Sequence, residues 1–459
     1  MKSLVYIVLF FCTLISSAQT ISGQEKFDVS FYKIDLNVND SSIYIEGSAT
    51  IVLSLLSASD SLNFELVDGY TIDSVYVDDN LAKFSHKNDI LSVDVPSEKE
   101  KMTIVVFYHG SAYEELPGDG IFHRRGFNDK GYTYTLTEPF AAKYFFPCKQ
   151  VLDDKADSVH VFITTDNNLK AGANGRLVNS IPLADNKIRY EWKSQYPIAY
   201  YLISFAVGDY FEYSFTTHLD DQDSVFVQNY MYNDSSYFED NKYNIDLTGN
   251  FLVLFSNLFG KYPFFEEKYG HCTVPIGGGM EHQTMTTLSN FSFLLVSHEL
   301  AHQWFGDNVT CAEWNDIWIN EGFASYGEYL AEEFLDSKDE ANLWMAEAHE
   351  FIMSEPGGSV YVPKGLENDE DRLFDYRLSY KKGAAIIHMM RQEVNNDVVF
   401  FDVLTTFQER YKDSVATGED FKALLEEKSG IDFTWFLTNG IMGKDIPFLK
   451  LTGFGVMIP

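Results

Sequence analysis

Two histidines four residues apart constrain this chain more than any other feature of its sequence. His298 and His302 stand in the run VSHELAHQW (296–304), after apolar residues that favour a buried helix. On an α-helix, positions i and i+4 lie on one face, about one turn apart. Both imidazoles can therefore reach one metal ion at about 2.0–2.1 Å, and Glu299 can reach a water molecule on that ion. We predict a metal-binding helix here, with Gly306 as its C-terminal stop.

The histidine pair alone is weak evidence, because many His-Glu-x-x-His matches are ordinary helix residues. A catalytic zinc site usually has three protein ligands and one water. Glu321, in the run WINEGFASY (318–326), is the candidate third ligand. The eighteen residues between His302 and Glu321 leave room for the first helix to end and for a second to begin beside it. The alternative is that Glu321 only occupies the first turn of a helix, where carboxylates are favoured.

These three side chains would leave a fourth position on the metal for water, whose pKa the ion lowers towards neutrality. Glu299 could accept a proton from that water as it attacks a carbonyl carbon, and could pass the proton to the leaving nitrogen. The developing oxyanion needs a second stabiliser beside the metal, a role that suits a tyrosine hydroxyl. The motif therefore predicts a hydrolase with one zinc ion (Zn2+) per chain.

Residues 1–18 have the features of a secretory signal peptide. An early lysine precedes the apolar run Leu4–Ile15, and Ser16 and Ala18 provide a small-residue cleavage site. The apolar run has 12 residues, which is short for a membrane anchor. No other segment is long and apolar enough to span a bilayer, so we expect a soluble protein that is secreted, either to the periplasm or outside the cell.

The formal net charge of −34 argues against nucleic acid and anionic membranes as partners. It favours cationic solutes, including the free amine of a peptide, although solubility is the simpler explanation. Removal of the signal peptide leaves Cys148, Cys272 and Cys311, so one disulfide with a free thiol, or no disulfide, is possible. Three cysteines cannot form a disulfide scaffold, and hydrophobic cores must hold the fold. The sequence does not indicate an oligomeric state.

The alternation of apolar and polar residues predicts an antiparallel β domain over residues 24–209. In the segment Tyr32–Asn39, apolar side chains alternate with polar ones, which is the period of a strand with one solvated face. In residues 210–447 the alternating pattern gives way to mostly helical patterns, and these residues form the predicted catalytic domain. Besides the metal-binding helix, helices are predicted there at 245–259, 320–335, 340–352, 379–394, 398–411 and 419–428, the last with Gly418 as a loose cap. Residues 448–459 form a short C-terminal remnant with one strand-like run, 448–456.

Four segments resemble the zinc aminopeptidases of the gluzincin clan, the family of alanyl aminopeptidase and leukotriene hydrolase. They are the runs HELAHQW (298–304), WINEGFASY (318–326), YKKGA (380–384) and GGMEH (278–282). The resemblance implies zinc on His298, His302 and Glu321. It also implies that Glu299 is general base and then acid, and that Tyr380 stabilises the oxyanion. The implied fold is α+β, with a saddle-like N-terminal β domain followed by a thermolysin-like catalytic domain.

The family's glycine-rich strand lies along the substrate, and its glutamate binds the free amine of the peptide. By this resemblance, Gly278, Gly279 and Met280 contact the substrate, and Glu281 binds the amine. Glu138, in the run EPFAAKYFFPC, is the implied second contact to the amine. A buried carboxylate that faces an ammonium group selects a chain end, because an internal peptide would leave it unpaired.

The chain departs from the commoner pattern of this family in several places. His282 replaces the usual asparagine; as a fourth metal ligand it would close the catalytic site, and we do not expect it to bind the metal. The segment between Glu281 and His298 is shorter than usual. The family's C-terminal helical domain is absent from this sequence, so a more open cleft is expected.

These features predict a secreted zinc aminopeptidase that removes the N-terminal residue of peptides with a free amine. Two alternatives stay open at this point. One is a zinc endopeptidase with the same metal chemistry, and the other is a weakly active peptide-binding relative without the cap domain.

Overall fold

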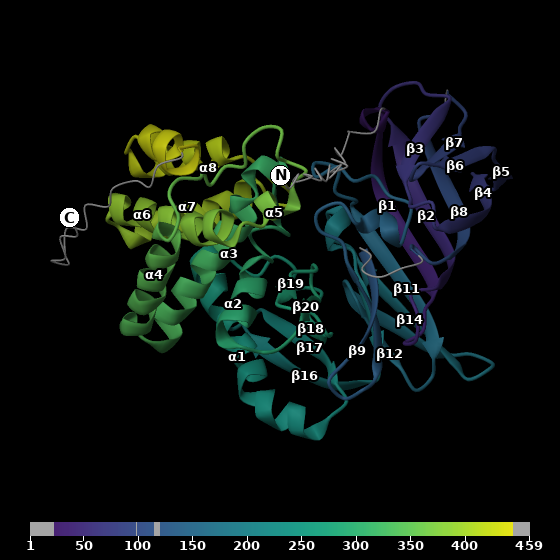
Figure 1. The fold of residues 1–459 in the computed structure, drawn as a ribbon, viewed down its shortest axis with the longest axis horizontal. Helices are drawn as coiled ribbons and strands as arrows, with labels where there is room; N and C mark the ends of the chain where they lie inside the picture. Colours follow the sequence, from purple (N-terminus) through teal and green to yellow (C-terminus); the bar gives the residue numbers. More distant parts are fainter. Residues whose placement is uncertain (1–22, 98, 114–119, 444–459) are drawn as a thin grey trace, which may run out of the picture.

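The computed structural model describes residues 23–97, 99–113 and 120–443. The predicted signal peptide (1–18) and the strand-like run 448–456 lie outside these residues. The described chain forms two parts side by side, with the strands of the N-terminal part on one side and a mostly helical C-terminal part on the other (Figure 1). The predicted α+β architecture is confirmed.

The N-terminal part is built around one large sheet. Its strands are β1 (Phe27–Asn37), β2 (Ile45–Leu55), β4 (Tyr70–Val77), β5 (Asn80–Leu81), β8 (Lys101–Gly110), β11 (Ser158–Asp166), β13 (Arg176–Pro182) and β14 (Lys187–Ser194). Their order in the sheet is β13-β14-β11-β1-β2-β8-β4-β5. In β1 the side chains of Tyr32, Ile34 and Leu36 are buried, as the alternation predicted.

The prediction of a purely antiparallel N-terminal domain is wrong at one pair of strands. β1 pairs with β2 in antiparallel fashion, but it runs parallel to β11, where Tyr32 lies opposite Val159. The alternation within a strand shows which of its faces is buried. It carries no information about the direction of a partner that comes more than a hundred residues later, so this pairing could not be seen in the sequence.

Two smaller sheets complete the N-terminal part. One contains β3 (Ser61–Glu65), β6 (Phe84–Lys87) and β7 (Ile90–Asp94), in the order β3-β7-β6. The other contains β9 (Gly120–Arg125), β10 (Gly131–Leu136), β12 (Lys170–Ala173) and β15 (Phe205–Gly208), in the order β12-β15-β10-β9. Glu138 follows the end of β10, and the hydroxyl of Tyr134 on β10 donates a hydrogen bond to the carbonyl of Pro275 in the C-terminal part (3.3 Å).

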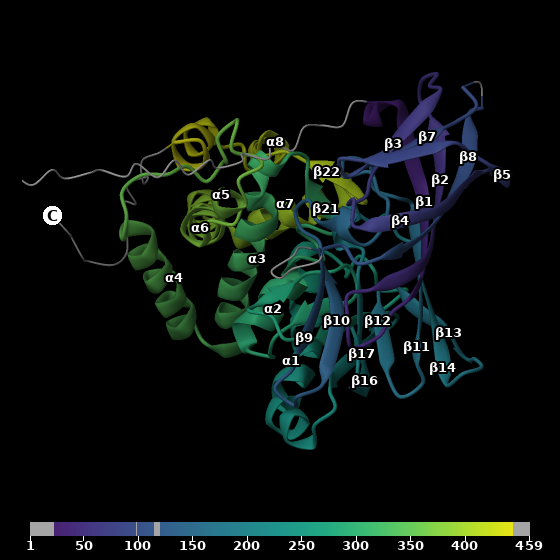
Figure 2. The same ribbon diagram turned by 45° about the vertical axis from the view of Figure 1, so that its right-hand side comes forward.

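The C-terminal part begins with a sheet of its own. Its strands are β16 (Tyr210–His218), β17 (Ser224–Tyr232), β18 (Tyr269–Thr273), β19 (Gly279–Met280) and β20 (Thr286–Leu288). Their order is β16-β17-β18-β20-β19, so β19 is an edge strand. Helix α1 (Ser235–Phe259) packs against β16 and β17 (Figure 2).

The helices that follow surround the two that carry the histidine motif and Glu321. They are α2 (Phe293–Ala301), α3 (Trp318–Ala331), α4 (Lys338–Met353), α5 (Glu370–Leu373), α6 (Gly383–Val394), α7 (Asp397–Arg410) and α8 (Gly418–Ser429). π-Helical turns cover Glu332–Asp336, Tyr376–Lys382 and Phe436–Ile441. Two short strands, β21 (Val309–Cys311) and β22 (Ser414–Ala416), pair in parallel.

Several predicted helix ends are corrected by local hydrogen bonds. Helix α1 begins at Ser235 rather than Ile245, because the side chain of Asp234 caps it by accepting from the Tyr237 amide (2.9 Å). Its first turns are mostly polar and carry no apolar stripe that could reveal them. Helix α2 ends at Ala301 and not near Gly306, since a tight turn continues from its last residue.

The caps of two later helices also differ from the prediction. Helix α8 is capped by Thr417 and not by Gly418: Thr417 and Asp420 exchange side-chain and backbone hydrogen bonds in a capping box. The predicted helix at 379–394 is α-helical only from Gly383, and the residues before it form the π-helical turn Tyr376–Lys382.

The two parts share one continuous core, which holds them in a fixed relation. Lys155 reaches from the N-terminal part and donates hydrogen bonds to the carbonyls of Asp307 (2.8 Å) and Asn308 (3.0 Å). These carbonyls lie in the turn that follows the histidine motif. A buried ammonium group therefore fixes the backbone just beyond the candidate metal site.

Cys148, Cys272 and Cys311 are all buried and free, so the alternative without a disulfide applies to the described part of the chain. Hydrophobic packing holds the fold, as expected. Among residues 23–443, so far as the structure describes them, no helix combines the length and the apolar character that crossing a bilayer requires.

Candidate metal centre and active-site cleft

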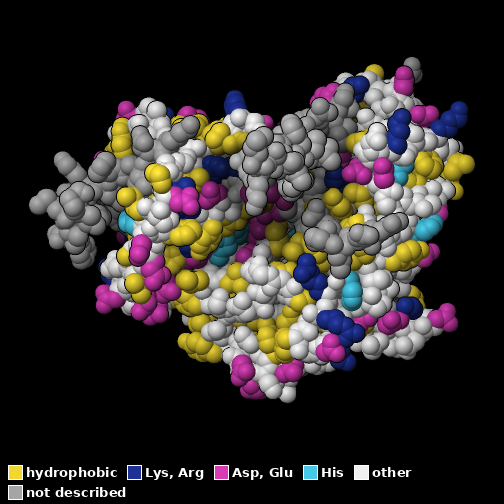
Figure 3. All heavy atoms as spheres, viewed as in Figure 1, with side chains coloured by type: hydrophobic (Ala, Val, Ile, Leu, Met, Phe, Trp, Pro, Cys, Tyr) yellow, Lys and Arg dark blue, Asp and Glu magenta, His cyan; other side chains and the backbone are white. Residues whose placement is uncertain are grey.

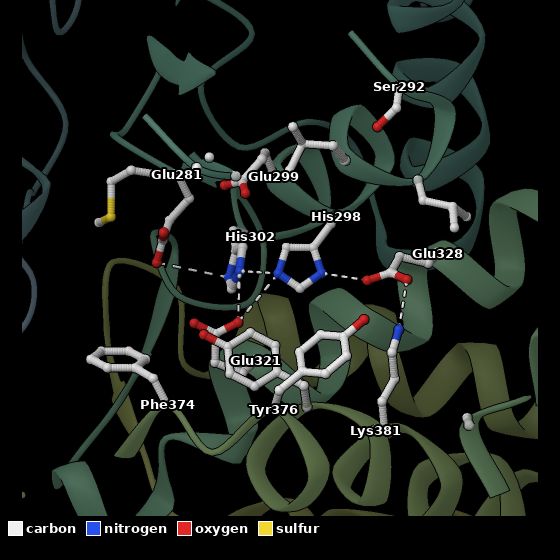
Figure 4. A pocket seen from close by; sticks show the side chains of 18 of the residues that line it. Glu281, Ser292, His298, Glu299, His302, Glu321, Glu328, Phe374, Tyr376 and Lys381 are labelled. Carbon is white, nitrogen blue, oxygen red and sulfur yellow. Dashed lines mark hydrogen bonds and ion pairs between the residues drawn. The ribbon is translucent and has the colours of Figure 1, made fainter. Parts of the chain in front are cut away.

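His298, His302 and Glu321 meet between two packed helices (Figure 4). His298 lies on α2, and His302 follows the last residue of that helix with helical backbone angles (φ −58°, ψ −28°), so both rings share a face. Glu321 lies in the first turn of α3, which packs against α2. Its Oε2 atom is 3.3 Å from the Nε2 atoms of both histidines. The two Nε2 atoms are 3.1 Å apart.

This triangle fits a tetrahedral zinc ion. Ligand atoms about 2.0–2.1 Å from a tetrahedral metal lie about 3.3 Å from one another, which matches the three measured separations. Two imidazole nitrogens and one carboxylate oxygen are also a donor set of catalytic zinc sites. Burial alone would raise the pKa of Glu321, but the two imidazoles lower it to about 2, so the carboxylate stays charged. All three residues line the cleft, so the metal would face it.

Glu299 lies beside this triangle without belonging to it. Its carboxylate, that of Glu281 and His302 have oxygen and ring nitrogen atoms within 4.8 Å of one another. That second group is looser, and the Nδ1 atom of His302 is already bonded to the carbonyl of Phe305 (3.0 Å), so the second group is not the metal site. Burial, only partly offset by the histidines, raises the pKa of Glu299 to about 8. A carboxyl group with such a pKa can exchange a proton near neutral pH.

Tyr380 stands over the ring of His298, one of the candidate metal ligands. Its ring stacks on that of His298, with the ring centres 5.9 Å apart and the planes 12° apart. It lies on the π-helical turn before α6, a kind of turn that is frequent at functional sites. Burial, together with the charge of Glu321, raises the pKa of Tyr380 well above its usual value. The hydroxyl therefore stays protonated and can donate a hydrogen bond.

Glu281 and Glu138 come from different parts of the chain and end in the same cleft. Each has one buried carboxylate oxygen, Oε1, that lacks a hydrogen-bond partner among the described residues. The Oε1 atom of Glu281 is 3.9 Å from the Nδ1 atom of His302. Burial, together with the charge of Glu281, raises the pKa of Glu138, and burial also raises that of Glu281. A cation that pairs with both carboxylates would stabilise them.

The cleft has a volume of about 700 Å³, and its floor is acidic. In the middle of the face shown in Figure 3, Asp or Glu side chains and histidine gather, with hydrophobic side chains beside them. Five glutamates line its buried part: Glu138, Glu281, Glu299, Glu321 and Glu328. Such a concentration of negative charge favours cationic groups in a ligand.

The glycine-rich segment forms one wall of the cleft. Gly279 and Met280 make up β19, which pairs with Leu288 and Thr287 of β20. Because β19 is an edge strand, its other side can pair with an extended peptide. A Cβ atom on Gly279 would collide with the Glu299 carboxylate, so the glycine lets strand and carboxylate approach closely. Gly278, with a φ of +92°, adopts a backbone conformation that favours glycine.

His282 does not join the metal site. Its Nδ1 atom is 2.8 Å from the Thr287 hydroxyl, and burial lowers its pKa to about 3. It belongs to neither group of possible metal ligands found among the described residues. The candidate ligand set is therefore His298, His302 and Glu321.

Three residues that the sequence analysis did not single out complete the site. The Glu328 carboxylate lies 2.8 Å from the Nδ1 atom of His298. It also accepts hydrogen bonds from Lys381 Nζ (2.9 Å) and from the Trp344 indole (2.8 Å). Glu328 orients the His298 ring, whose other nitrogen faces Glu321 and His302. The spacing of Glu321 and Glu328 in the sequence could have indicated that Glu328 lies at the site. Glu328 follows Glu321 by two helical turns and lies on the same face of the helix.

We expect Glu328→Gln to weaken zinc binding about 10- to 100-fold, the usual effect of losing such a partner. The neutral amide holds the His298 ring less strongly and leaves Lys381 without its anion. Competition with a chromophoric chelator on the metal-depleted protein measures this affinity. Trp344→Phe is the matched control, since it removes one hydrogen bond to Glu328 and keeps the carboxylate on His298. An unchanged affinity in Glu328→Gln would contradict the orienting role.

Comparison with known proteins places both parts of this chain in one family. The family model described as "Peptidase M1 N-terminal domain" matches residues 29–202. The model described as "Peptidase family M1 domain" matches residues 243–439.

Curated relatives include the puromycin-sensitive aminopeptidase of Caenorhabditis elegans, which is 25% identical over 92% of this chain and 47% of its own length. Aminopeptidase M1-A of Oryza sativa subsp. japonica is 30% identical over 72% of this chain and 39% of its own length. The chain thus spans about half, or less, of the length of these relatives.

Solved structures share the fold over most of the chain. An M1 zinc metallopeptidase from Deinococcus radiodurans superposes with a TM-score of 0.80 at 23% identity, covering 92% of this chain and 95% of that one. Leukotriene A4 hydrolase from Saccharomyces cerevisiae gives a TM-score of 0.73 at 19% identity, with 89% of this chain and 66% of that one covered.

Proposed function

Because this chain belongs to peptidase family M1, we propose that it is a zinc-dependent aminopeptidase, which hydrolyses the N-terminal residue from peptides. The family implies zinc, and the His298, His302 and Glu321 triangle suits one such ion. The resemblance found in the sequence had implied the same family, and that prediction is confirmed.

One observation supports the choice of an aminopeptidase over other zinc peptidases. Beside the metal triangle, Glu138 and Glu281 each hold a buried carboxylate oxygen without a hydrogen-bond partner among the described residues. An ammonium group pairs with both and relieves the repulsion between them. An internal peptide segment brings no charge to this place and would leave both carboxylates desolvated and unpaired, which disfavours the endopeptidase alternative.

Zinc held by His298, His302 and Glu321 would supply Lewis-acid polarisation of the scissile carbonyl and activation of the attacking water. Glu299 accepts the proton of that water and returns it to the leaving nitrogen. Tyr380 donates a hydrogen bond to the carbonyl oxygen as negative charge develops there.

Binding residues fix which bond is presented to these groups. Glu281 and Glu138 hold the amine at one end of the cleft, so only the first peptide bond reaches Glu299 and Tyr380. Gly278, Gly279 and Met280 support the extended substrate along the free side of β19.

A matched pair of peptides, one with a free amine and one N-acetylated, tests this function. The zinc-loaded protein is expected to release the first residue of the free peptide and to leave the acetylated one almost untouched. Cleavage of both at internal bonds would favour the endopeptidase. Binding without cleavage of either would favour the weakly active binding protein.

We also propose that the protein is exported, to the periplasm or beyond the cell. The support is the signal-peptide pattern of residues 1–18. Sequencing the N-terminus of the mature protein tests this, and a mature chain that still begins at Met1 would contradict it.

A further inference from the structure

We infer that Gln303 positions the amine anchor: it fixes where the Glu281 carboxylate lies relative to the metal triangle, and so sets how strictly a free amine is required. This inference rests on the proposed function and adds a positioning residue to it. Gln303 follows His302 directly in the chain and does not line the cleft. It therefore acts through the backbone that carries Glu281.

Glu281 precedes a tight turn, His282–Met285, that joins β19 to β20. Within this turn Thr284 has a φ of +65°, a backbone conformation that is a genuine outlier for a β-branched residue. The Thr284 carbonyl accepts a hydrogen bond from the buried Lys268 Nζ (2.7 Å). A strained conformation persists only where the surrounding structure determines it, so the turn depends on the contacts that hold it.

Gln303 holds both sides of this turn with one side chain. Its Nε2 atom donates to the Glu281 carbonyl (2.9 Å), and its Oε1 atom accepts from the Thr284 amide (2.8 Å). A carbonyl needs a donor and an amide needs an acceptor, and one planar amide group serves both. The side chain of Gln303 is fully buried. The backbone at Glu281 therefore cannot shift relative to His302 without breaking one of these bonds.

The same turn is also held by the N-terminal part of the chain. The Thr284 hydroxyl accepts from the Gly175 amide (2.7 Å), and the Asn174 side chain donates to the Gln283 carbonyl (2.8 Å). Glu138, the second amine contact, belongs to that part as well. These bonds place Glu281 against Glu138, while the bonds of Gln303 place it against the metal triangle.

The position of Glu281 matters because the amine and the reacting carbonyl belong to the same residue of the substrate. Figure 4 shows the Glu281 carboxylate turned toward the His302 ring, with Oε1 3.9 Å from Nδ1. If the turn moves, an ammonium group on Glu281 no longer brings the first carbonyl to the triangle. A misplacement of 1 Å can cost a reaction about 100-fold.

The variant Gln303→Met tests this role. Methionine has a similar length but makes neither of the two hydrogen bonds, so the Glu281 carbonyl and the Thr284 amide lose their partner. We expect kcat/KM for a free-amine peptide to fall roughly 10- to 100-fold. The rate on the N-acetylated peptide, which does not use the anchor, should not change. Zinc affinity, measured by competition with a chromophoric chelator, should stay within a few-fold of the wild type.

Gln228→Met is the matched control. Gln228 is a buried glutamine on β17 whose Nε2 atom donates to Glu212 (2.9 Å), and it lies outside the cleft lining. Its replacement removes a buried hydrogen bond without touching the turn, so the ratio of kcat/KM between free and acetylated peptides should stay as in the wild type. A ratio that falls equally in both variants would mean that any buried glutamine has this effect, and would overturn the inference.

Thr284→Gly loosens the same turn without changing the core beside the metal helix. Glycine accepts the positive φ, so the protein should stay folded. The hydroxyl that accepts from Gly175 is lost, and the ratio between free and acetylated peptides should fall in the same direction as in Gln303→Met. An unchanged ratio in Thr284→Gly would contradict the role of the turn.

A double variant separates positioning from a general structural effect. If Gln303 acts through the Glu281 carboxylate, adding Gln303→Met to Glu281→Ala should cost roughly threefold or less in kcat/KM for the free-amine peptide, because the anchor is already gone. The same loss in the wild-type and Glu281→Ala backgrounds would show that Gln303 supports the fold alone, and would overturn the inference.

The outcomes also separate this inference from the proposed function. If the wild type prefers the free-amine peptide and Gln303→Met keeps that preference in full, the inference is overturned while the aminopeptidase stands. If the zinc-loaded wild type cleaves neither peptide, the proposed function fails, and this inference fails with it.

Discussion

Replacing Glu299 by glutamine is expected to lower kcat on a free-amine peptide by roughly 10²- to 10⁴-fold, the usual contribution of general acid–base catalysis. Glutamine has nearly the same shape, but it cannot accept the proton of the attacking water. Glu299 stands outside the triangle of His298, His302 and Glu321, so zinc should stay bound. Rapid kinetics and metal analysis of the same sample measure the two effects together.

The control for this variant is Glu239→Gln, the same chemical change at an exposed position of α1 outside the cleft lining. It should keep full activity. Turnover of Glu299→Gln within a few-fold of the wild type would remove Glu299 from the mechanism. Loss of zinc from Glu299→Gln would mean that its carboxylate supports the metal site rather than the proton transfer.

Replacing Glu281 by alanine is expected to lower kcat/KM for free-amine peptides strongly, mainly through a higher KM. The loss of one partner of a buried charge pair costs about 2–5 kcal/mol, or roughly 30- to several-thousand-fold. Glu138→Ala should act in the same direction. Glu281→Gln, which keeps an acceptor and loses the charge, should lie between alanine and the wild type.

The N-acetylated peptide is the internal reference for this prediction. Its rate, low at the outset, should not change in Glu281→Ala, because it brings no ammonium group to the carboxylate. If the free and acetylated peptides lose activity by the same factor, Glu281 supports the fold of the cleft and does not anchor an amine.

Much of the site could be predicted from the sequence because its geometry is local. The spacing of His298 and His302 on one helix determines that their rings share a face. Glu321 could be predicted as well, since the eighteen residues between it and His302 leave room for the first helix to end and for a second to begin beside it. The structure places all three atoms of this candidate site at the separations that zinc requires.

Other contacts depend on tertiary packing that no local pattern reveals. Tyr380 was one tyrosine among 28, and only the family resemblance singled it out before the structure brought its ring over His298. Lys381 and Trp344 reach Glu328 from two different helical segments. Their meeting is a property of how α4 and the turn before α6 pack against α3.

In the fold as well, features set by local sequence could be predicted, and features set by contacts between distant segments could not. The alternation in β1 predicted a strand and its buried face, but not its parallel partner β11. Residues 379–382, the second half of the π-helical turn Tyr376–Lys382, were predicted as the start of an ordinary helix. The wider winding of this turn has no period in the sequence that distinguishes it from an α-helix over so few residues.

The most direct measurement adds zinc stepwise to the metal-depleted protein while the cleavage of the free-amine peptide is followed. The account predicts no activity at the start, a linear rise and a plateau at one zinc per chain. His302→Ala should not be restored by the same titration, because one corner of the triangle is missing. Full activity of the metal-depleted protein, or full restoration of His302→Ala by one equivalent of zinc, would contradict the central claim.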